Sequence, residues 1–304
     1  MKYLQSIRLK LSIFLVSSIL TVGLIFLFIN LSFNQNHLNS VDTIINSNII
    51  INSSVEAKGK FKVVYATLQR KKSILRKERF KKYKSFEKIS QKLNQIVIMH
   101  NDIKINLGDC GSVNAYDKPS EQSITICYEL MERFKEVCRN SYKSKKSNIN
   151  QSEFINKINR QVAGTIVFTF FHELGHTLIE ELDLPVTGKE EDTVDEFSTI
   201  VLSELGQEYA ALASALQFGL SGNREIQYVS KDLSFWDEHS LNYQRFYNII
   251  CLVYGKNPEE YNVLVEKIGI PPQRQTTCKM DYIKKLKSWR ILLSPHLRAG
   301  VNLL

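Results

Sequence analysis

FFHELGHTLIEELDLPVTGKEEDTVDEFSTI, residues Phe170 to Ile200, places two histidines and a glutamate in a run that is otherwise typical of a protein interior. The segment TIVFTFFHELGHTLI is apolar on nearly every side, which predicts a buried helix, part of a longer one from about Glu153 to Glu181. Burying His172, Glu173 and His176 costs free energy unless other groups compensate their polarity. The sequence therefore raises the question of what these side chains bind.

The five residues from His172 to His176 have the pattern H-E-x-x-H. Residues four apart on a helix return to the same face, so the two imidazoles can bind one tetrahedral zinc ion. Glu173, beside the first histidine, can then act as the base for an attacking water. The pentapeptide alone is suggestive only, but the predicted buried helix around it favours a metal site.

A catalytic zinc needs a third protein ligand and an open position. The candidates, all acidic, follow on the next predicted helix: Glu190, Glu191, Asp192, Asp195 and Glu196. Thr187 to Glu190 has the form of a capping box, which assigns Glu190 to the helix start. Glu191 and Asp195 share a face, so we assign Glu191 as the ligand and Asp195 as the acceptor of a hydrogen bond from a zinc-bound histidine. The reverse assignment stays open, and acidic residues also stabilise a helix N-terminus without any metal.

Two histidines and a carboxylate predict one Zn²⁺ per chain. Zinc would activate water and polarise the scissile carbonyl, while Glu173 takes a proton and passes it to the leaving amine. The sequence thus predicts a metallopeptidase that acts on peptide or protein substrates. One alternative is a catalytically inactive binding or scaffold protein. Another is an intramembrane protease, since the run from Val162 to Ile179 is apolar apart from the motif.

H-E-x-x-H followed by a helix with E-x-x-x-D is similar to the gluzincin group of zincin metallopeptidases. The whole stretch from Phe170 to Ser198 more closely resembles DUF4344, a family of bacterial metallopeptidases known mainly as a domain of unknown function. The segments CGSVNAYDKPSEQSITICYEL, Cys110 to Leu130, and FWDEHSLNYQRFYNIICLVYG, Phe235 to Gly255, share this resemblance. It implies an α+β, zincin-like domain over residues 61–304. Its small sheet would be mixed or antiparallel, its H-E-x-x-H helix buried, and its C-terminal part mostly helical.

The resemblance also implies roles for two further segments. In zincins, a strand at the sheet edge pairs with extended substrate, and Asn114, Ala115 and Tyr116, followed by the strand Ser123–Cys127, are similar to that segment. An ordinary core strand is the alternative. Zincins often stabilise the oxyanion with a histidine or tyrosine, and His239 is the candidate. A surface or capping role for this histidine stays open.

The N-terminus predicts a membrane anchor. The basic residues 1–10 precede an uncharged run of 23 residues, Leu11 to Phe33, which is long enough to span a bilayer. No small-x-small cleavage site follows directly, so an uncleaved signal anchor is favoured over a removed signal peptide that would leave the protein secreted. We expect residues 1–10 in the cytoplasm, 34–60 as a spacer and the domain on the periplasmic side of the inner membrane.

The five cysteines fit an oxidising compartment. Cys110/Cys127 and Cys251/Cys278 are the expected disulfides, with Cys138 left over. Five buried free thiols are the alternative. No C-x-x-C pair occurs, which argues against a cysteine-based zinc site or a redox motif.

The formal net charge is +9, and residues 58–92 hold fourteen Lys or Arg against two Glu. A single basic amphipathic helix is predicted from Arg70 to about Gln95. A solvated helix face is the favoured interpretation, with contact to an anionic membrane surface or an acidic partner as the alternative. The chain has no motif typical of nucleic-acid binding.

Overall fold

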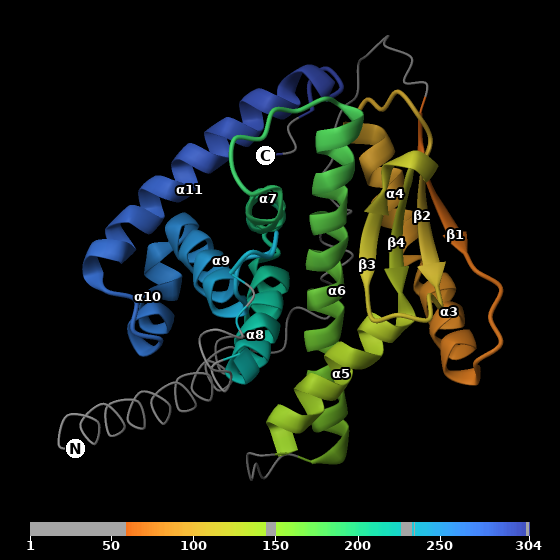
Figure 1. Cartoon of the computed structure of the whole chain (residues 1–304), viewed down its shortest axis with the longest axis horizontal. Helices are drawn as coiled ribbons and strands as arrows, with labels where there is room; N and C mark the ends of the chain where they lie inside the picture. Colours follow the sequence, from red (N-terminus) through yellow and green to blue (C-terminus); the bar gives the residue numbers. More distant parts are fainter. Residues whose placement is uncertain (1–58, 144–149, 226–232, 234, 302–303) are drawn as a thin grey trace.

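The computed structural model describes residues 59–143, 150–225, 233, 235–301 and 304 (Figure 1). The predicted cytoplasmic segment 1–10, the anchor 11–33 and nearly all of the spacer 34–60 lie outside the described residues. The membrane anchor therefore stays a prediction.

The described chain is α+β and mostly helical, with one small sheet on one side of the molecule (Figure 1). Its strands are β1 (Phe61–Tyr65), β2 (Ile103–Gly108), β3 (Ala115–Lys118) and β4 (Ser123–Cys127). They lie in the order β1-β2-β4-β3; β1, β2 and β4 are parallel and β3 is antiparallel to β4. The sheet is thus mixed, one of the two expected forms, and β3 lies at its edge.

Two helices, α3 (Lys71–Tyr83) and α4 (Ser85–Ile96), replace the single basic helix predicted between Arg70 and Gln95, so that prediction was wrong. The break is at Lys84, which has a φ of 51° in the left-handed region and ends one helix as it begins the next. Nothing in the run of basic residues signals this break. α4 buries apolar side chains every three or four residues, and these cover one face of the sheet.

The central helix α6 (Gln151–Glu181) carries the H-E-x-x-H motif (Figure 1). Asn150 caps it by accepting a hydrogen bond from the Glu153 N–H over 2.9 Å. The sheet packs on one side of α6, and α7 (Glu190–Glu204) and α8 (Glu208–Glu225) pack on the other. This explains why its second half is apolar all round. By length and composition α6 is also the one helix in the described part of the chain that could cross a membrane, but 72% of that apolar window is buried within the fold, as in a core helix.

The remaining α-helices of the described chain are α5 (Tyr128–Lys143), α9 (Asn242–Lys256), α10 (Pro258–Lys267) and α11 (Pro272–Leu293). The mostly helical C-terminal part is therefore confirmed.

Both expected disulfides are present. Cys110–Cys127 ties the segment after β2 to the end of β4, and Cys251–Cys278 joins α9 to α11. Cys138 is a free, buried thiol. Each bond restricts the unfolded chain and so stabilises the folded one.

Gly175, inside the motif, allows α6 and α7 to approach closely. A Cβ at this position would lie 2.8 Å from Val194 Cγ1 and 3.1 Å from Phe197 Cδ1, both on α7. The missing side chain lets the first turn of α7 reach the motif histidines.

We expect Gly175→Ala to lower the free energy of unfolding by about 1–2 kcal/mol. Overpacking costs about 1–3 kcal/mol, which exceeds the gain in helix propensity of up to about 1 kcal/mol. Gly188→Ala is the matched control, because no atom lies within 4 Å of a Cβ there. Chemical denaturation of both variants measures the difference, and equal stability would show that the contact between α6 and α7 tolerates a methyl group.

Candidate metal centre

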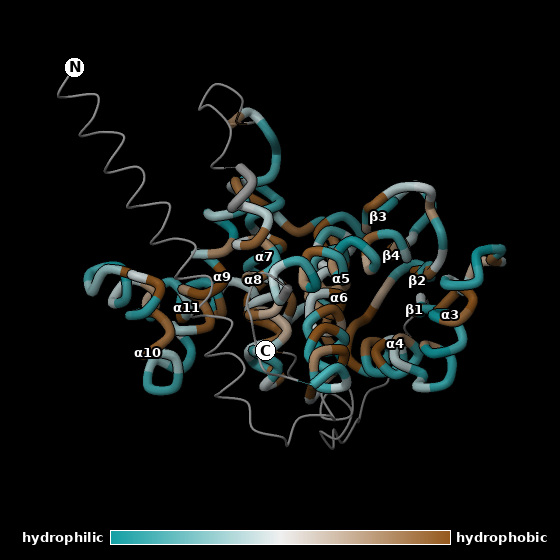
Figure 2. Tube along the Cα trace, turned by 90° about the horizontal axis from the view of Figure 1, so that it is seen from below, coloured by the Kyte–Doolittle hydropathy of each residue, from teal (hydrophilic) through white to brown (hydrophobic). Residues whose placement is uncertain are grey.

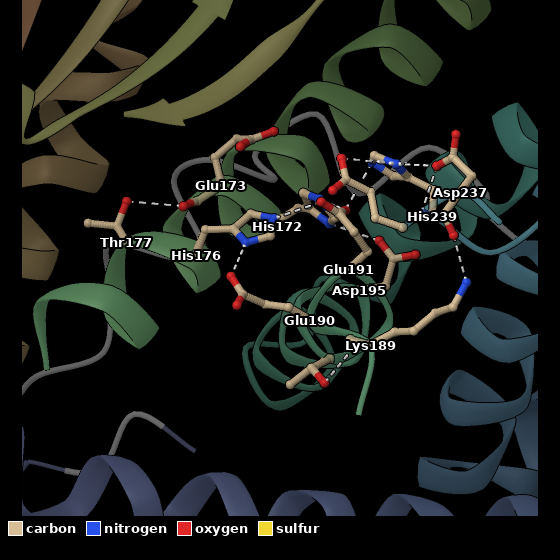
Figure 3. Close-up of polar contacts among 12 residues, drawn as sticks. His172, Glu173, His176, Thr177, Lys189, Glu190, Glu191, Asp195, Asp237 and His239 are labelled. Carbon is tan, nitrogen blue, oxygen red and sulfur yellow. Dashed lines mark hydrogen bonds and ion pairs between the residues drawn. The ribbon is translucent and has the colours of Figure 1, made fainter. Parts of the chain in front are cut away.

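His172 and His176 lie one turn apart on α6, with ring centroids 5.0 Å from each other, and both point toward the first turn of α7 (Figure 3). Glu191 meets them there. Its Oε2 is 3.1 Å from His172 Nε2, and its Oε1 is 3.4 Å from His176 Nε2. The structure thus brings together the three residues that the sequence selected as ligands.

One potential ligand atom each from His172, His176 and Glu191 lies within 4.8 Å of the others. Glu191 Oε2 is buried and faces the ring nitrogens, yet it makes no hydrogen bond of good geometry. Such an oxygen is costly to bury unless a cation satisfies it. Two imidazole nitrogens and a carboxylate oxygen are a donor set that suits zinc, so these residues fit the metal.

Carboxylates bind the far nitrogens of both motif histidines. Asp195 Oδ1 is 2.9 Å from His172 Nδ1, the contact expected from the sequence, and Glu190 Oε1 is 2.7 Å from His176 Nδ1 (Figure 3). A carboxylate at Nδ1 favours a proton there and leaves the Nε2 lone pair directed at Glu191, the arrangement common behind metal-bound histidines.

The contact of Glu190 corrects the predicted capping box from Thr187 to Glu190. α7 begins two residues later than that motif required, with Lys189 at the N-cap position and no side-chain cap hydrogen bond. Glu190 is therefore the first helical residue, and its carboxylate is free to reach His176. The adjacency of Glu190 to Glu191 was the one sequence signal for this role.

A third histidine lies beside the cluster. His239 Nε2 is 3.0 Å from Glu191 Oε2, and its Nδ1 is 3.1 Å from Asp237 Oδ1 (Figure 3). Asp237 also accepts the backbone N–H of His239 at 2.8 Å, which fixes the local turn. Asp237 was not among the predicted site residues, although a carboxylate two residues before a candidate histidine is a usable local signal.

Arg245, on α9, supports Asp195 from behind. Its Nε and Nη2 donate to the two carboxylate oxygens of Asp195 over 2.7 and 2.8 Å, and its guanidinium lies 4.0 Å from the centre of the Phe218 ring. Burial alone would raise the pKa of Asp195, but the Arg245 and His172 contacts hold it at about 2. Arg245 lies 50 residues from Asp195 along the chain, so no local spacing could have shown this pairing.

The pKa of each titratable side chain in the cluster depends on the charges of its neighbours. Burial works against protonation of His172, yet Asp195 and Glu191 raise its pKa to about 9. Burial would raise the pKa of Glu191, but the rings of His172, His176 and His239 hold it far below its usual range. Protons and a metal ion therefore compete for the same nitrogens, and acid should weaken metal binding.

Glu173 is buried between α6 and the edge strand β3. Burial raises the pKa of its carboxyl group, although the charges of His172 and His176 and a hydrogen bond from the Asp117 backbone act in the opposite direction. Thr177 Oγ1 donates to Asp117 Oδ1 at 2.6 Å and ties β3 to the motif helix. Neither Asp117 nor Thr177 was among the predicted site residues.

The alternation of β3 decides which backbone groups face its open edge. Cys127 N–H donates to the Asn114 carbonyl at 3.2 Å. In the antiparallel register, Asn114 and Tyr116 then turn their main chains toward β4, while Ala115 and Asp117 turn theirs outward. Of the three expected edge residues, Ala115 alone offers its backbone to a neighbour.

The comparisons with known proteins found one family. The sequence model of DUF4344, described as "Putative metallopeptidase", matches residues 65–293. This range holds the entire cluster, from Asn114 to Arg245. No curated protein and no solved structure matches the chain.

We expect Arg245→Ala to lower the free energy of unfolding by about 3–5 kcal/mol, because it leaves Asp195 buried without a cation. The side chains of Arg245 and Asp195 are 12% and 7% exposed. Arg274→Ala is the matched control, since the Arg274–Asp281 pair is 44% and 32% exposed and a pair near the surface contributes about 0–1 kcal/mol. Denaturation curves of both variants measure the difference, and equal losses would contradict a supporting role for Arg245.

Proposed function

The chain belongs to the DUF4344 family, described as "Putative metallopeptidase", and we propose on this basis that it is a zinc-dependent peptidase acting on peptide or protein substrates. The convergence of His172, His176 and Glu191 on one point carries the proposal. Carboxylates at Nδ1 of both histidines support it, because they orient the rings for metal binding.

His172, His176 and Glu191 would hold the metal and leave a position open, as in catalytic rather than structural zinc sites. Bound zinc supplies an activated water and polarises the scissile carbonyl. The three side chains stay in place because Asp195, Glu190 and the helix contact at Gly175 restrain them from the outside.

Glu173 acts as the general base in this proposal. Its carboxyl group is buried, and burial moves its pKa upward, toward the range in which a carboxylate both accepts and returns a proton near neutral pH. It takes a proton from the attacking water and delivers it to the leaving amine. The hydrogen bond from the Asp117 backbone orients this carboxylate beside the strand that would hold the substrate.

The substrate would lie extended along the open edge of β3, within the segment Asn114, Ala115 and Tyr116. Main-chain hydrogen bonds to Ala115 would give affinity that does not depend on substrate sequence. The Tyr116 side chain, partly exposed, would contact the substrate or solvent next to this edge. Because Thr177 ties β3 to α6, a peptide on this edge would sit next to Glu173.

His239 would stabilise the negative charge that develops on the carbonyl oxygen. Glu191 favours its protonated form by raising its pKa, despite partial burial, and Asp237 adds to this effect. A protonated ring donates a hydrogen bond and carries positive charge, as an oxyanion partner requires. The alternative role is a fourth metal ligand, which would close the site.

We further propose that the chain is anchored in a membrane. Residues 11–33 would anchor the chain in the inner membrane, with the peptidase domain on the periplasmic side; removal of the segment would release a secreted form. The second candidate function is a zincin-like scaffold or binding protein without turnover. The metal cluster alone does not distinguish it from the enzyme, but the buried base Glu173 favours the enzyme.

The first test measures bound zinc and hydrolysis of a mixed peptide library. We expect about one zinc per chain in wild type and Glu173→Gln, and loss or strong weakening of binding in His176→Ala and Glu191→Ala. Hydrolysis should require Glu173, because general base catalysis contributes about 10²–10⁴-fold. Zinc bound by wild type without any hydrolysis would favour the scaffold, and a folded wild type without zinc would contradict both roles of the cluster.

A second test separates the two roles of His239. We expect His239→Ala to keep its zinc and to lower kcat by about 10²–10³-fold with little change in KM, as for other residues that stabilise an oxyanion. Loss of zinc from this variant would identify His239 as a ligand instead. His100→Ala is the control, because this exposed histidine lies outside the cluster.

A further inference from the structure

Helix α3 presents an outer face that no described element covers. It lies at the end of the molecule opposite α10 and α11 (Figures 1 and 2). Its inner side is held by buried Ser73 and by Phe80, whose ring packs 5.4 Å from that of Phe86. Leu75, 63% exposed, lies at the centre of the outer face. The residues three, four and seven positions from Leu75 share this face; they are Lys71, Lys72, Glu78, Arg79 and Lys82.

Positive charge on this face is largely uncompensated. α3 contains seven Lys or Arg and one acidic residue, Glu78. Arg76, on the inner side, reaches Glu132 at 3.4 Å. Among the residues that the structure describes, no acidic side chain pairs with Lys71, Lys72 or Arg79.

Exposed apolar side chains lie both on this basic face and on its two flanks. Besides Leu75, Ile74 and Tyr83 on α3 are 40% and 56% exposed. A leucine at the centre of a charged face that contacts only water contributes no burial of apolar surface. Helices that bind a bilayer interface combine these features, since their apolar side chains enter the headgroup region while Lys and Arg attract anionic lipid.

Helix α11 is a useful comparison because it also exposes apolar residues, among them Ile283 at 64%. Its cations are more often neutralised: Arg274 pairs with Asp281, Lys285 with Glu196 and Arg290 with Glu204. An anionic surface should therefore select α3 over α11, although their apolar exposure is similar.

The position of α3 in the chain fits a bilayer as its partner. The sequence predicts an anchor at residues 11–33 and a spacer at 34–60. A spacer of this length that behaves as a random coil would have a root-mean-square span of about 30 Å, which would keep α3 within reach of the membrane that holds the predicted anchor.

We propose that α3 docks on an anionic lipid bilayer, with Leu75 among the headgroups and Lys71, Lys72, Arg79 and Lys82 around it. The sheet lies between this helix and the metal centre, so docking leaves the centre open (Figure 1). The inference does not depend on the peptidase chemistry. Its surface is defined by α3 alone.

The experiment places a fluorescent probe in the full chain, reconstituted in lipid vesicles. In a Trp236→Phe background, which removes the 85% exposed native tryptophan, Leu75→Trp reports on α3 and Ile283→Trp on α11. These two positions have matched exposure. Quenching of the tryptophan fluorescence by brominated lipid is compared between two kinds of vesicle. One contains phosphatidylcholine alone, and in the other about one third of the lipid is phosphatidylglycerol.

We expect quenching at position 75 in the anionic vesicles only, and none at position 283. Lys72→Gln/Arg79→Gln should weaken docking roughly tenfold or more, because each basic residue near such a surface contributes substantially. Lys284→Gln/Lys287→Gln, which removes the same charge from α11, should have little effect. No quenching at position 75, equal quenching in both lipids, or an equal effect of the two double variants would overturn the proposal.

Discussion

The fold depends on the contact between the imidazoles of α6 and the carboxylates of α7. A helix that is apolar on nearly all sides could not bury His172 and partly bury His176 in the protein interior without partners. Glu191, Glu190 and Asp195 supply those partners within one and a half turns of the neighbouring helix. The close approach at Gly175 makes this possible. The site can therefore assemble only if α6 and α7 pack together.

Residues from other parts of the fold hold the side chains of the cluster in place. Arg245 on α9 neutralises Asp195, Asp237 holds His239, and Thr177 joins the motif helix to Asp117 on the sheet edge. The contacts of Arg245 and Thr177 satisfy side chains that would otherwise be buried or partly buried without a partner, and the contact of Asp237 fixes a more exposed ring. The domain thus places a candidate base, a candidate ligand set and an open strand edge side by side, which is the arrangement that the proposed hydrolysis of an extended peptide would require.

Much of the site could be predicted because its spacing is local. Helical geometry alone relates His172 to His176 and Glu191 to Asp195, and the formation of disulfides followed from the oxidising compartment that the N-terminus predicts. The remaining features depend on tertiary structure or on a local backbone choice. Arg245 and Asp117 come from elements distant in sequence, and the left-handed Lys84 divides a run that reads as one helix. The N-cap of α7 lies two residues after the position that the apparent capping box requires. For that reason Glu190 was predicted to cap the helix, whereas its carboxylate contacts His176.

We propose above all that zinc binds where the Nε2 atoms of His172 and His176 meet the carboxylate of Glu191. Anomalous diffraction at the zinc edge, from crystals of the zinc-loaded protein, tests it most directly. We expect one strong peak about 2.0–2.2 Å from both nitrogens and from a Glu191 oxygen, with Glu173 not coordinated. A peak bound by other residues, or none beside these histidines in the zinc-loaded crystals, would contradict it.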